Sequence, residues 1–229
     1  MDLSKREAVN CPLCHANHFR EKFEIDSWKI VECEECHFIY VNPRLEKNEL
    51  LRLYNENYFD NEQVGYLHYR ESRELRKKNF SKWVEDAMPF IRKEKNLNAL
   101  DIGCAAGYCL EVFSERGWKP FGVELNSDYA AGLLRDGYKV YNAPLLDISF
   151  EEKYHVITLF DVVEHLADLR KHFDKLNSIV AENGAIIIIT PDYNSLQRKL
   201  FGKKWFQFKP IEHINYFSLD SITRLATEA

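Results

Sequence analysis

The sequence predicts an α/β fold built on a doubly wound parallel sheet, and three observations lead to this prediction. An apolar run over 97–102 enters a turn bracketed by Gly103 and Gly107, and an amphipathic segment follows over 108–115. Strand-like and helix-like segments then alternate along the chain, and right-handed crossovers between them produce such a sheet. The run 185–190 begins with five apolar residues in a row, which is typical of a central parallel strand covered on both faces.

The composition is that of an ordinary globular protein. The chain has 229 residues, of which 45% are hydrophobic and 29% charged, enough for one large domain or one medium domain with a small module. The formal net charge of −5 provides no overall basic field for nucleic acid or an anionic membrane. No apolar run reaches the length of a membrane span, and no signal-peptide pattern is present. We therefore expect a cytoplasmic protein without a membrane partner.

Residues 1–45 are predicted to form a zinc-binding knuckle. Two C-x-x-C elements are separated by 18 residues, and such a pairing is a strong zinc signal. The residues over 19–31 would form a small hairpin, and the metal would supply stability that so short a module lacks. Four thiolates close the coordination shell, which makes the site structural, although His15 or His37 could replace a cysteine. The expected ligands are Cys11, Cys14, Cys33 and Cys36.

Residues 46–95 are predicted to form a helical linker or cap. Helix-favouring stretches cover 46–54 and 67–94, and Pro89 is expected to kink or end the second helix. An apolar face at helical spacing would pack on the sheet; it consists of Phe80, Trp83, Val84 and Ala87. A cluster of cations in this helix could bind phosphate or nucleic acid, but interleaved acids favour a solvated helix face. The cations are Arg70, Arg73, Arg76, Lys77 and Lys78, and the acids are Glu71 and Glu74.

Residues 96–229 contain the predicted sheet. The expected strands are 97–102, 119–124, 138–141, 154–160 and 185–190. Gly117 and Gly137 are expected to stop the helices that precede the second and third strands. Asn126 or Ser127, and further along Asp168, have the side chains of helix N-caps.

Polar groups gather where the first two predicted strands end. The turn from Gly103 to Gly107 leaves the first N–H groups of the next helix open to a polar ligand. Glu124 ends the second strand about 20 residues later, where an acid can accept hydrogen bonds from a ribose diol. The alternative is an ordinary strand–helix turn with Glu124 as a solvated strand end.

The stretch from Asp101 to Gly107 resembles the first motif of the class I S-adenosylmethionine-dependent methyltransferases, which reads acid-x-Gly-x-Gly-x-Gly. Ala105 replaces the middle glycine, and Glu124 matches the acid of the second strand. The resemblance implies a Rossmann-like methyltransferase sheet with S-adenosyl-L-methionine as cofactor. It also implies two further strands beyond the helix-like run 218–228, so we expect the C-terminal strands to be missing. The implied cofactor-binding residues are Asp101, Gly103, Ala105, Gly107, Glu124 and Asp161.

A four-cysteine knuckle before an Asn-Pro-Arg turn at 42–44 resembles the N-terminal region of some sugar C-methyltransferases. In ubiquinone-pathway O-methyltransferases, residues matching Asp161, Glu164 and His165 bind a divalent metal. We favour cofactor contacts alone for this turn, because adjacent side chains on a helix do not face each other.

The segment around Trp205 and His213 resembles the acceptor lid of small-molecule methyltransferases. In sugar C-methyltransferases a Glu-His pair in this region supplies the base, which implies catalytic roles for Glu212 and His213, with His165 nearby. An unperturbed histidine titrates near neutral pH and suits proton transfer. The alternative for His213 is a backbone hydrogen bond that anchors the lid.

The sequence thus predicts an S-adenosylmethionine-dependent methyltransferase with a structural Zn²⁺. The expected partner is a small-molecule acceptor, such as a nucleotide-linked sugar or another biosynthetic intermediate, and nucleic acid is not expected. The sequence leaves the oligomeric state open. The alternative function is a binding module, in which the knuckle recognises RNA or protein and the sheet holds the cofactor without turnover.

Overall fold

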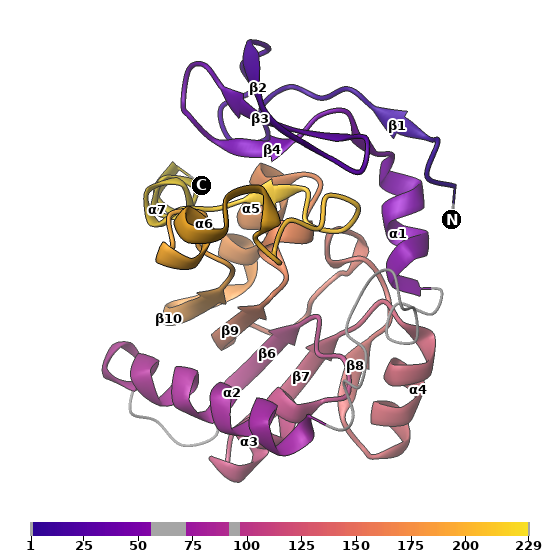
Figure 1. The fold of residues 1–229 in the computed structure, drawn as a ribbon. Coiled ribbons are helices and arrows are strands. Elements are labelled where there is room, and N and C mark those ends of the chain that lie inside the picture. The colour runs from indigo at the N-terminus through magenta and orange to yellow at the C-terminus, as the bar shows by residue number, and fades with distance from the viewer. Residues whose placement is uncertain (1, 56–71, 92–96, 229) are drawn as a thin grey trace. The chain divides into compact units, whose positions relative to one another are not determined.

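The computed structural model describes residues 2–55, 72–91 and 97–228 (Figure 1). The chain divides into two compact units. The first, which we call the cysteine unit, is drawn from residues 1–53, 161–174 and 190–229. The second, the sheet unit, is drawn from residues 54–160 and 175–189.

The sheet unit contains a five-stranded sheet in the order β10-β9-β6-β7-β8, and all neighbouring strands are parallel. Its strands are β6 (Asn98–Ile102), β7 (Lys119–Val123), β8 (Lys139–Tyr141), β9 (Tyr154–Phe160) and β10 (Val180–Ile189). The chain runs outward from β6 to β8 and then returns to β9 on the other side of β6. This reversal confirms the doubly wound α/β fold and places a switch point at the carboxyl ends of β6 and β9.

Helices α2 (Arg73–Ala87), α3 (Tyr108–Glu115) and α4 (Ser127–Arg135) belong to the sheet unit, and α5 (Leu169–Ile179) precedes β10. Asn126 caps α4, because its side-chain oxygen accepts hydrogen bonds from the N–H groups of Asp128 and Tyr129. Gly117 and Gly137 follow α3 and α4 with φ of 72° and 87°, as helix stops do. Short 3₁₀ turns lie at Met88–Phe90 and Leu145–Asp147.

The position of β10 differs from the sequence prediction. Among the described strands, β10 lies at the edge of the sheet and pairs with β9 alone, whereas its apolar run predicted a central strand. The isoleucines at 186–189 are half-buried. An uninterrupted apolar run reports the surroundings of the two faces of a strand and contains no information about the hydrogen bonding of its two edges.

Helix α2 packs on the sheet unit through the predicted apolar face. Phe80 and Val84 are buried in a cluster with α3 and the sheet, and Trp83 and Ala87 pack against it half-buried. The α-helix ends at Ala87, directly before the 3₁₀ turn that contains Pro89. Residues 67–71 and 92–94 of the predicted helix, with Arg70 and Glu71, lie outside the described residues.

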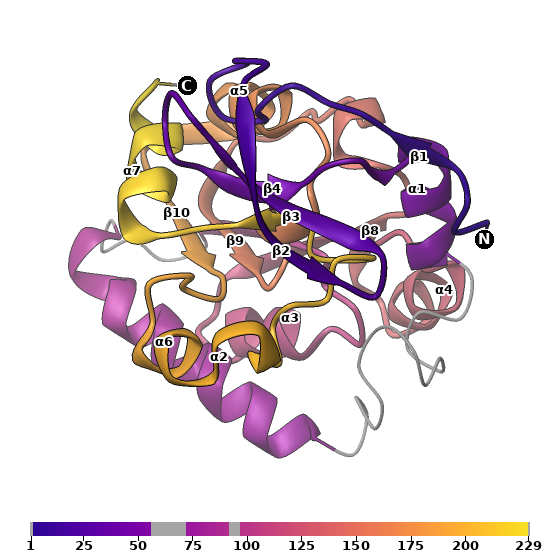
Figure 2. The same cartoon turned by 45° about the horizontal axis from the view of Figure 1, so that its top comes forward.

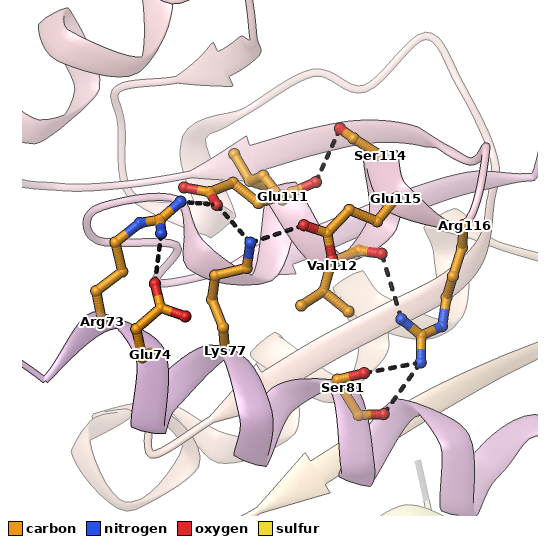
Figure 3. A network of polar contacts seen from close by, with 10 residues as sticks. Arg73, Glu74, Lys77, Ser81, Glu111, Val112, Ser114, Glu115 and Arg116 are labelled. Carbon is orange, nitrogen blue, oxygen red and sulfur yellow. Dashed lines mark hydrogen bonds and ion pairs between the residues drawn. The ribbon is translucent and has the colours of Figure 1, made fainter.

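An ion-pair network joins α2 to α3 (Figure 3). Lys77 Nζ lies 2.8 Å from Glu111 Oε2 and 2.7 Å from Glu115 Oε1, and Arg73 also pairs with Glu111. At the other end of the interface, Arg116 donates to the backbone oxygen and hydroxyl of Ser81. Two cations of the predicted basic cluster therefore hold α3, the helix that follows the glycine turn.

The cysteine unit contains a four-stranded antiparallel sheet in the order β11-β4-β3-β2 (Figure 2). Its strands are β2 (Phe19–Ile25), β3 (Trp28–Cys33), β4 (Ile39–Val41) and β11 (Asn215–Tyr216), and β1 (Arg6–Glu7) pairs separately with β5 (Arg44–Leu45). Helices α1 (Lys47–Asn55), α6 (Leu196–Phe201) and α7 (Leu219–Glu228) complete the unit, with 3₁₀ turns at Val163–His165 and Gly202–Lys204. The predicted hairpin is β2–β3, and its two turn residues, Asp26 and Ser27, both have positive φ.

The N-terminal hairpin shares its sheet with the C-terminal segment. Asn215 of β11 pairs with Tyr40 of β4, and Tyr216 pairs with Ile39. Trp28, from β3, and Trp205 lie in one buried cluster. The strands next to the cysteines are thus stabilised by residues far away in the sequence.

We predict that Lys77→Ala lowers the free energy of unfolding by about 1 kcal/mol, the upper end of values for partly exposed ion pairs. Lys77 has 17% and Glu111 25% of the side chain exposed, so solvent screens the pair incompletely. Lys78→Ala is the matched control, because Lys78 is exposed on the same helix. Chemical denaturation measures both variants, and equal losses would contradict a specific role of the network.

Candidate functional site

The loop between β6 and α3 lies at the carboxyl end of β6, and its backbone is exposed at Gly103. Gly103 is exposed with φ of 74°, and the N–H groups of Gly103 and Cys104 donate to the Val123 oxygen over 2.8 and 3.1 Å. Gly107, at the N-cap of α3, has φ of 79°, and a Cβ there would lie 2.3 Å from Leu133 Cδ2. The positive φ favours glycine at position 103, and the clash with Leu133 adds a steric reason for glycine at position 107.

The Glu124 carboxylate ties this loop to the end of β7. Its Oε2 accepts the N–H of Ala105 over 2.7 Å, and its Oε1 accepts the N–H of Asn126 over 2.7 Å. Only 6% of Glu124 is exposed, and this burial raises its pKa against the opposing effect of the backbone N–H groups. The backbone N–H of Leu125 also bonds the carboxylate, and because a carboxylate has about four lone-pair sites, Glu124 can still accept a further hydrogen bond.

Asp101 is the second buried acid of the sheet unit. Its Oδ1 accepts the hydroxyl of Thr158, on β9, over 2.5 Å. Burial, together with the nearby Glu124 charge, raises the pKa of Asp101 to about 7. The sequence analysis missed Thr158, although a single hydroxyl within the apolar run of β9 was a visible signal.

The structure divides the predicted cofactor-binding residues between the two units. The residues in the sheet unit are Asp101, Gly103, Ala105, Gly107 and Glu124. Asp161 directly follows β9 and belongs to the cysteine unit. It has φ of 54°, a conformation that non-glycine residues seldom adopt.

The four predicted cysteines lie together in the cysteine unit. Cys11 Sγ is 3.5 Å from Cys36 Sγ, Cys14 Sγ is 3.5 Å from Cys33 Sγ, and all four sulfurs lie within 4.8 Å of one another. A tetrahedral zinc site with Zn–S bonds of about 2.3 Å places its sulfurs about 3.8 Å apart. The donor set and its spacing therefore fit one tetrahedral ion.

The two C-x-x-C turns have the same backbone structure. In each, the N–H groups two and three residues after the first cysteine donate to its sulfur. His15 and His37, at equivalent places, have φ of 65° and 60° and donate their N–H groups to the oxygens of Cys11 and Cys33. The Nδ1 of His37 lies 3.3 Å from a Glu32 carboxylate oxygen, which supports sulfur ligands alone.

The predicted catalytic residues form a second polar cluster in the cysteine unit. His165 Nδ1 lies 2.8 Å from the backbone oxygen of Glu212, and His213 Nδ1 lies 2.9 Å from that of Gln207. A backbone carbonyl only accepts, so each ring is protonated at Nδ1 and its Nε2 has the lone pair. The two rings are 4.9 Å apart in an edge-to-face arrangement. The Glu212 carboxylate is buried and pairs with Lys209 over 3.0 Å.

Several acceptor atoms of this cluster have no hydrogen-bond partner within the described residues. They are Glu164 Oε1, His213 Nε2 and Asn215 Oδ1. The other Glu164 oxygen accepts the Thr190 hydroxyl over 2.9 Å, and burial raises the pKa of Glu164 to about 8. Burial and the neighbouring His165 hold the pKa of His213 well below its usual value, so this ring is neutral at physiological pH.

Glu164, His165 and His213 could also hold a metal ion, since one ligand atom from each lies within 4.8 Å of the others. This set differs from the one that the resemblance implied, because His213 takes the place of Asp161. Sequence reasoning did not anticipate Thr190 or Asn215 in the cluster. Neither has a motif: Thr190 follows β10, which pairs with β9, and Asn215 lies in β11, which pairs with β4.

The comparisons with known proteins agree with this architecture. A family model described as a methyltransferase domain matches residues 66–229. The chain is 25% identical over 121 residues to a ubiquinone biosynthesis O-methyltransferase of Leptothrix cholodnii, which covers 49% of this chain and 50% of that protein. The homologous enzyme of Nitrobacter winogradskyi is 26% identical over 117 residues, covering 46% and 45%. The chain thus spans about half the length of the curated relatives it matches.

Two solved structures share the fold. A SAM-dependent methyltransferase from Archaeoglobus fulgidus superposes with a TM-score of 0.56 at 22% identity, covering 70% of this chain and 69% of that one. The plantazolicin methyltransferase BpumL in complex with SAH superposes with a TM-score of 0.56 at 15% identity, covering 69% and 65%. Given the family match, the glycine loop and the doubly wound sheet, the chain belongs to the methyltransferase domain family and contains an S-adenosylmethionine-dependent methyltransferase domain.

Proposed function

We propose that the protein transfers a methyl group from S-adenosylmethionine to a small-molecule acceptor, such as a nucleotide-linked sugar or another biosynthetic intermediate. One observation supports cofactor binding above all: the loop from Gly103 to Gly107 is closed onto Glu124 at the carboxyl ends of β6 and β7. The curated relatives, named for ubiquinone biosynthesis, support an acceptor of small-molecule biosynthesis.

Each predicted cofactor residue has a role in this proposal. S-adenosylmethionine supplies an electrophilic methyl group on a sulfonium. Glu124 would accept a ribose hydroxyl, Gly103 would let the cofactor lie against exposed backbone, and Gly107 would shape the turn by leaving room for Leu133. Ala105 holds Glu124 in place through its N–H. Asp101 and Asp161, acids near the ends of β6 and β9, would complete the binding residues.

His213 is the proposed base. Its Nδ1–H is directed at the Gln207 oxygen, and its neutral Nε2 has a lone pair without a partner among the described residues. It can therefore take a proton from an acceptor hydroxyl or a comparable group. Glu212 would position His165 through its backbone oxygen, and His165 in turn packs against the His213 ring.

Zn²⁺ is the proposed ion of the four-cysteine cluster, in residues 1–45. Four sulfurs leave no open coordination position, so its role would be structural. The ion would fix the two turns on either side of the β2–β3 hairpin, and β3 pairs with β4, the strand that pairs with β11. The metal would thus help to place the C-terminal segment that contains Glu212 and His213.

We predict that Glu124→Gln raises the Kd for S-adenosylhomocysteine roughly tenfold, because the loss of one charge-assisted hydrogen bond costs about 1.4 kcal/mol or more. Isothermal titration calorimetry measures this Kd. Asp128→Asn is the control, since Asp128 is an exposed acid close by on α4. An unchanged Kd, with the melting temperature preserved, would remove Glu124 from the cofactor site.

We predict one zinc per chain, measured by elemental analysis of the purified protein. Cys36→Ser lowers this content and the melting temperature, because the loss of a ligand opens the coordination shell. Cys109→Ala is the control, since Cys109 lies in the sheet unit beside Thr158. Zinc content that is independent of Cys36, or absent altogether, would contradict the proposal.

We predict that His213→Asn lowers the methyl-transfer rate about a hundredfold or more, as expected for loss of a general base. Asparagine can still donate to the Gln207 oxygen but takes up no proton. His172→Asn is the matched control, because His172 Nδ1 also bonds a backbone oxygen, that of Asp168. Release of S-adenosylhomocysteine with a panel of candidate acceptors measures the rate. Full activity of the His213 variant, or an equal loss in both, would disprove the base role.

A further inference from the structure

Helix α6 and the turn after it display large apolar side chains to solvent. Leu196 is 71% exposed, Leu200 72%, Phe201 57% and Phe206 59%. Single exposed apolar residues are common on protein surfaces, but four within eleven residues concentrate exposed apolar groups in one segment, as interaction sites do. We call these four residues the α6 apolar surface; helix α6 is labelled in Figure 2.

The orientation of this segment is fixed by other residues. Trp205, 3% exposed, lies in the core of the cysteine unit. Arg198 Nε donates to the Tyr193 oxygen over 2.8 Å, and its guanidinium lies 4.2 Å from the Tyr193 ring centre. The Ser195 side chain caps the helix by accepting the Arg198 N–H. These contacts fix the orientation of α6 on the cysteine unit, and its apolar side chains remain exposed to solvent.

The charge around the α6 apolar surface is of one sign. Residues 195–211 contain five basic residues and no acidic residue, in a chain with a net charge of −5. Arg198 stacks on Tyr193, and Lys209 pairs with Glu212. Lys199, Lys203 and Lys204 are exposed, and in the part of the chain that the structure describes they form no ion pair. Three exposed lysines without an ion pair among the described residues therefore lie in the same short segment as the apolar side chains.

We propose that the α6 apolar surface docks on an anionic lipid bilayer. Exposed leucine and phenylalanine side chains next to lysines are the signature of segments that lie in the membrane interface, with the apolar groups among the acyl chains and the cations at the headgroups. Long lysine side chains reach the headgroup level while their methylene groups contact the apolar layer. Charge complementarity selects the lipid surface over a neutral partner.

This attachment is peripheral. No helix among the described residues is both long and apolar enough to span a bilayer. The overall charge, which argued against a membrane partner, conceals the basic character of this segment. Docking would place the cysteine unit, with its Glu212–His213 pair, at the membrane surface, and this inference does not depend on the identity of the acceptor.

Co-sedimentation of the full chain with phosphatidylcholine vesicles, with and without phosphatidylserine, tests the proposal. We expect binding only to the phosphatidylserine vesicles and a decrease with salt. Phe201→Ser with Phe206→Ser lowers the partition coefficient about tenfold or more, as does Lys203→Gln with Lys204→Gln. Phe90→Ser, which removes an 80% exposed phenylalanine of the sheet unit, is the matched control and binds as the parent does.

Two results would overturn the inference. One is binding that is absent, or that is equal in the parent and both double variants. The other is a lipid-free dimer that the Phe201–Phe206 variant converts to a monomer, since a second copy of the chain would then cover the surface. Equal melting temperatures of all variants, expected for exposed positions, ensure that a loss of binding does not reflect unfolding.

Discussion

The Glu124 carboxylate and the backbone N–H groups that bond it determine the shape of the loop between β6 and α3. A loop that contains Gly103, Ala105 and Gly107 has the backbone freedom to adopt many conformations. Glu124 selects one of them, because its two oxygens bind the loop and the start of α4 at once. The α2–α3 ion pairs then hold the helix on which the loop ends. A single acid therefore serves both the structure of the loop and the proposed recognition of the ribose.

The cysteine unit combines segments that are far apart in sequence, and its antiparallel sheet joins the N-terminal segment to the C-terminal one. Strand β11, which follows the Glu212–His213 pair, hydrogen-bonds β4, which follows the second cysteine pair. Asn215 also donates to the backbone oxygen of Leu166, next to His165. These contacts bring residues from three parts of the chain to one polar cluster. A zinc ion would stabilise this arrangement because it would fix the turns on either side of the β2–β3 hairpin.

Sequence patterns predicted local features such as helix caps and stops, but they could not predict which strands and side chains pair across the chain. Asn126, Gly117 and Gly137 have short-range roles as caps, and the structure has each of them where the pattern placed it. The four cysteines cluster as their spacing indicated. In contrast, the spacing of residues in the sequence does not reveal the hydrogen bonds from Thr158 to Asp101 and from Thr190 to Glu164. Those contacts depend on the order and register of the strands. The edge position of β10 was missed for the same reason, since apolar faces do not reveal which strand lies beside them.

The polar cluster around Glu164, His165 and His213 contains buried atoms that have no hydrogen bond in the part of the chain that the structure describes. Such atoms destabilise the fold, and this loss of stability favours a functional role for the cluster. A buried polar atom without a hydrogen bond destabilises a fold by about 1–3 kcal/mol, and Glu164 Oε1, His213 Nε2 and Asn215 Oδ1 all lack one within the described residues. His213 Nε2 and Asn215 Oδ1 are acceptors, so a donor or a cation would satisfy them, whereas Glu164, with its pKa raised to about 8, can also carry a proton and donate. Leucine or methionine could fill the same space without the cost. A bound group with N–H, O–H or positive charge to share would satisfy the His213 and Asn215 acceptors, which lack a partner within the described residues.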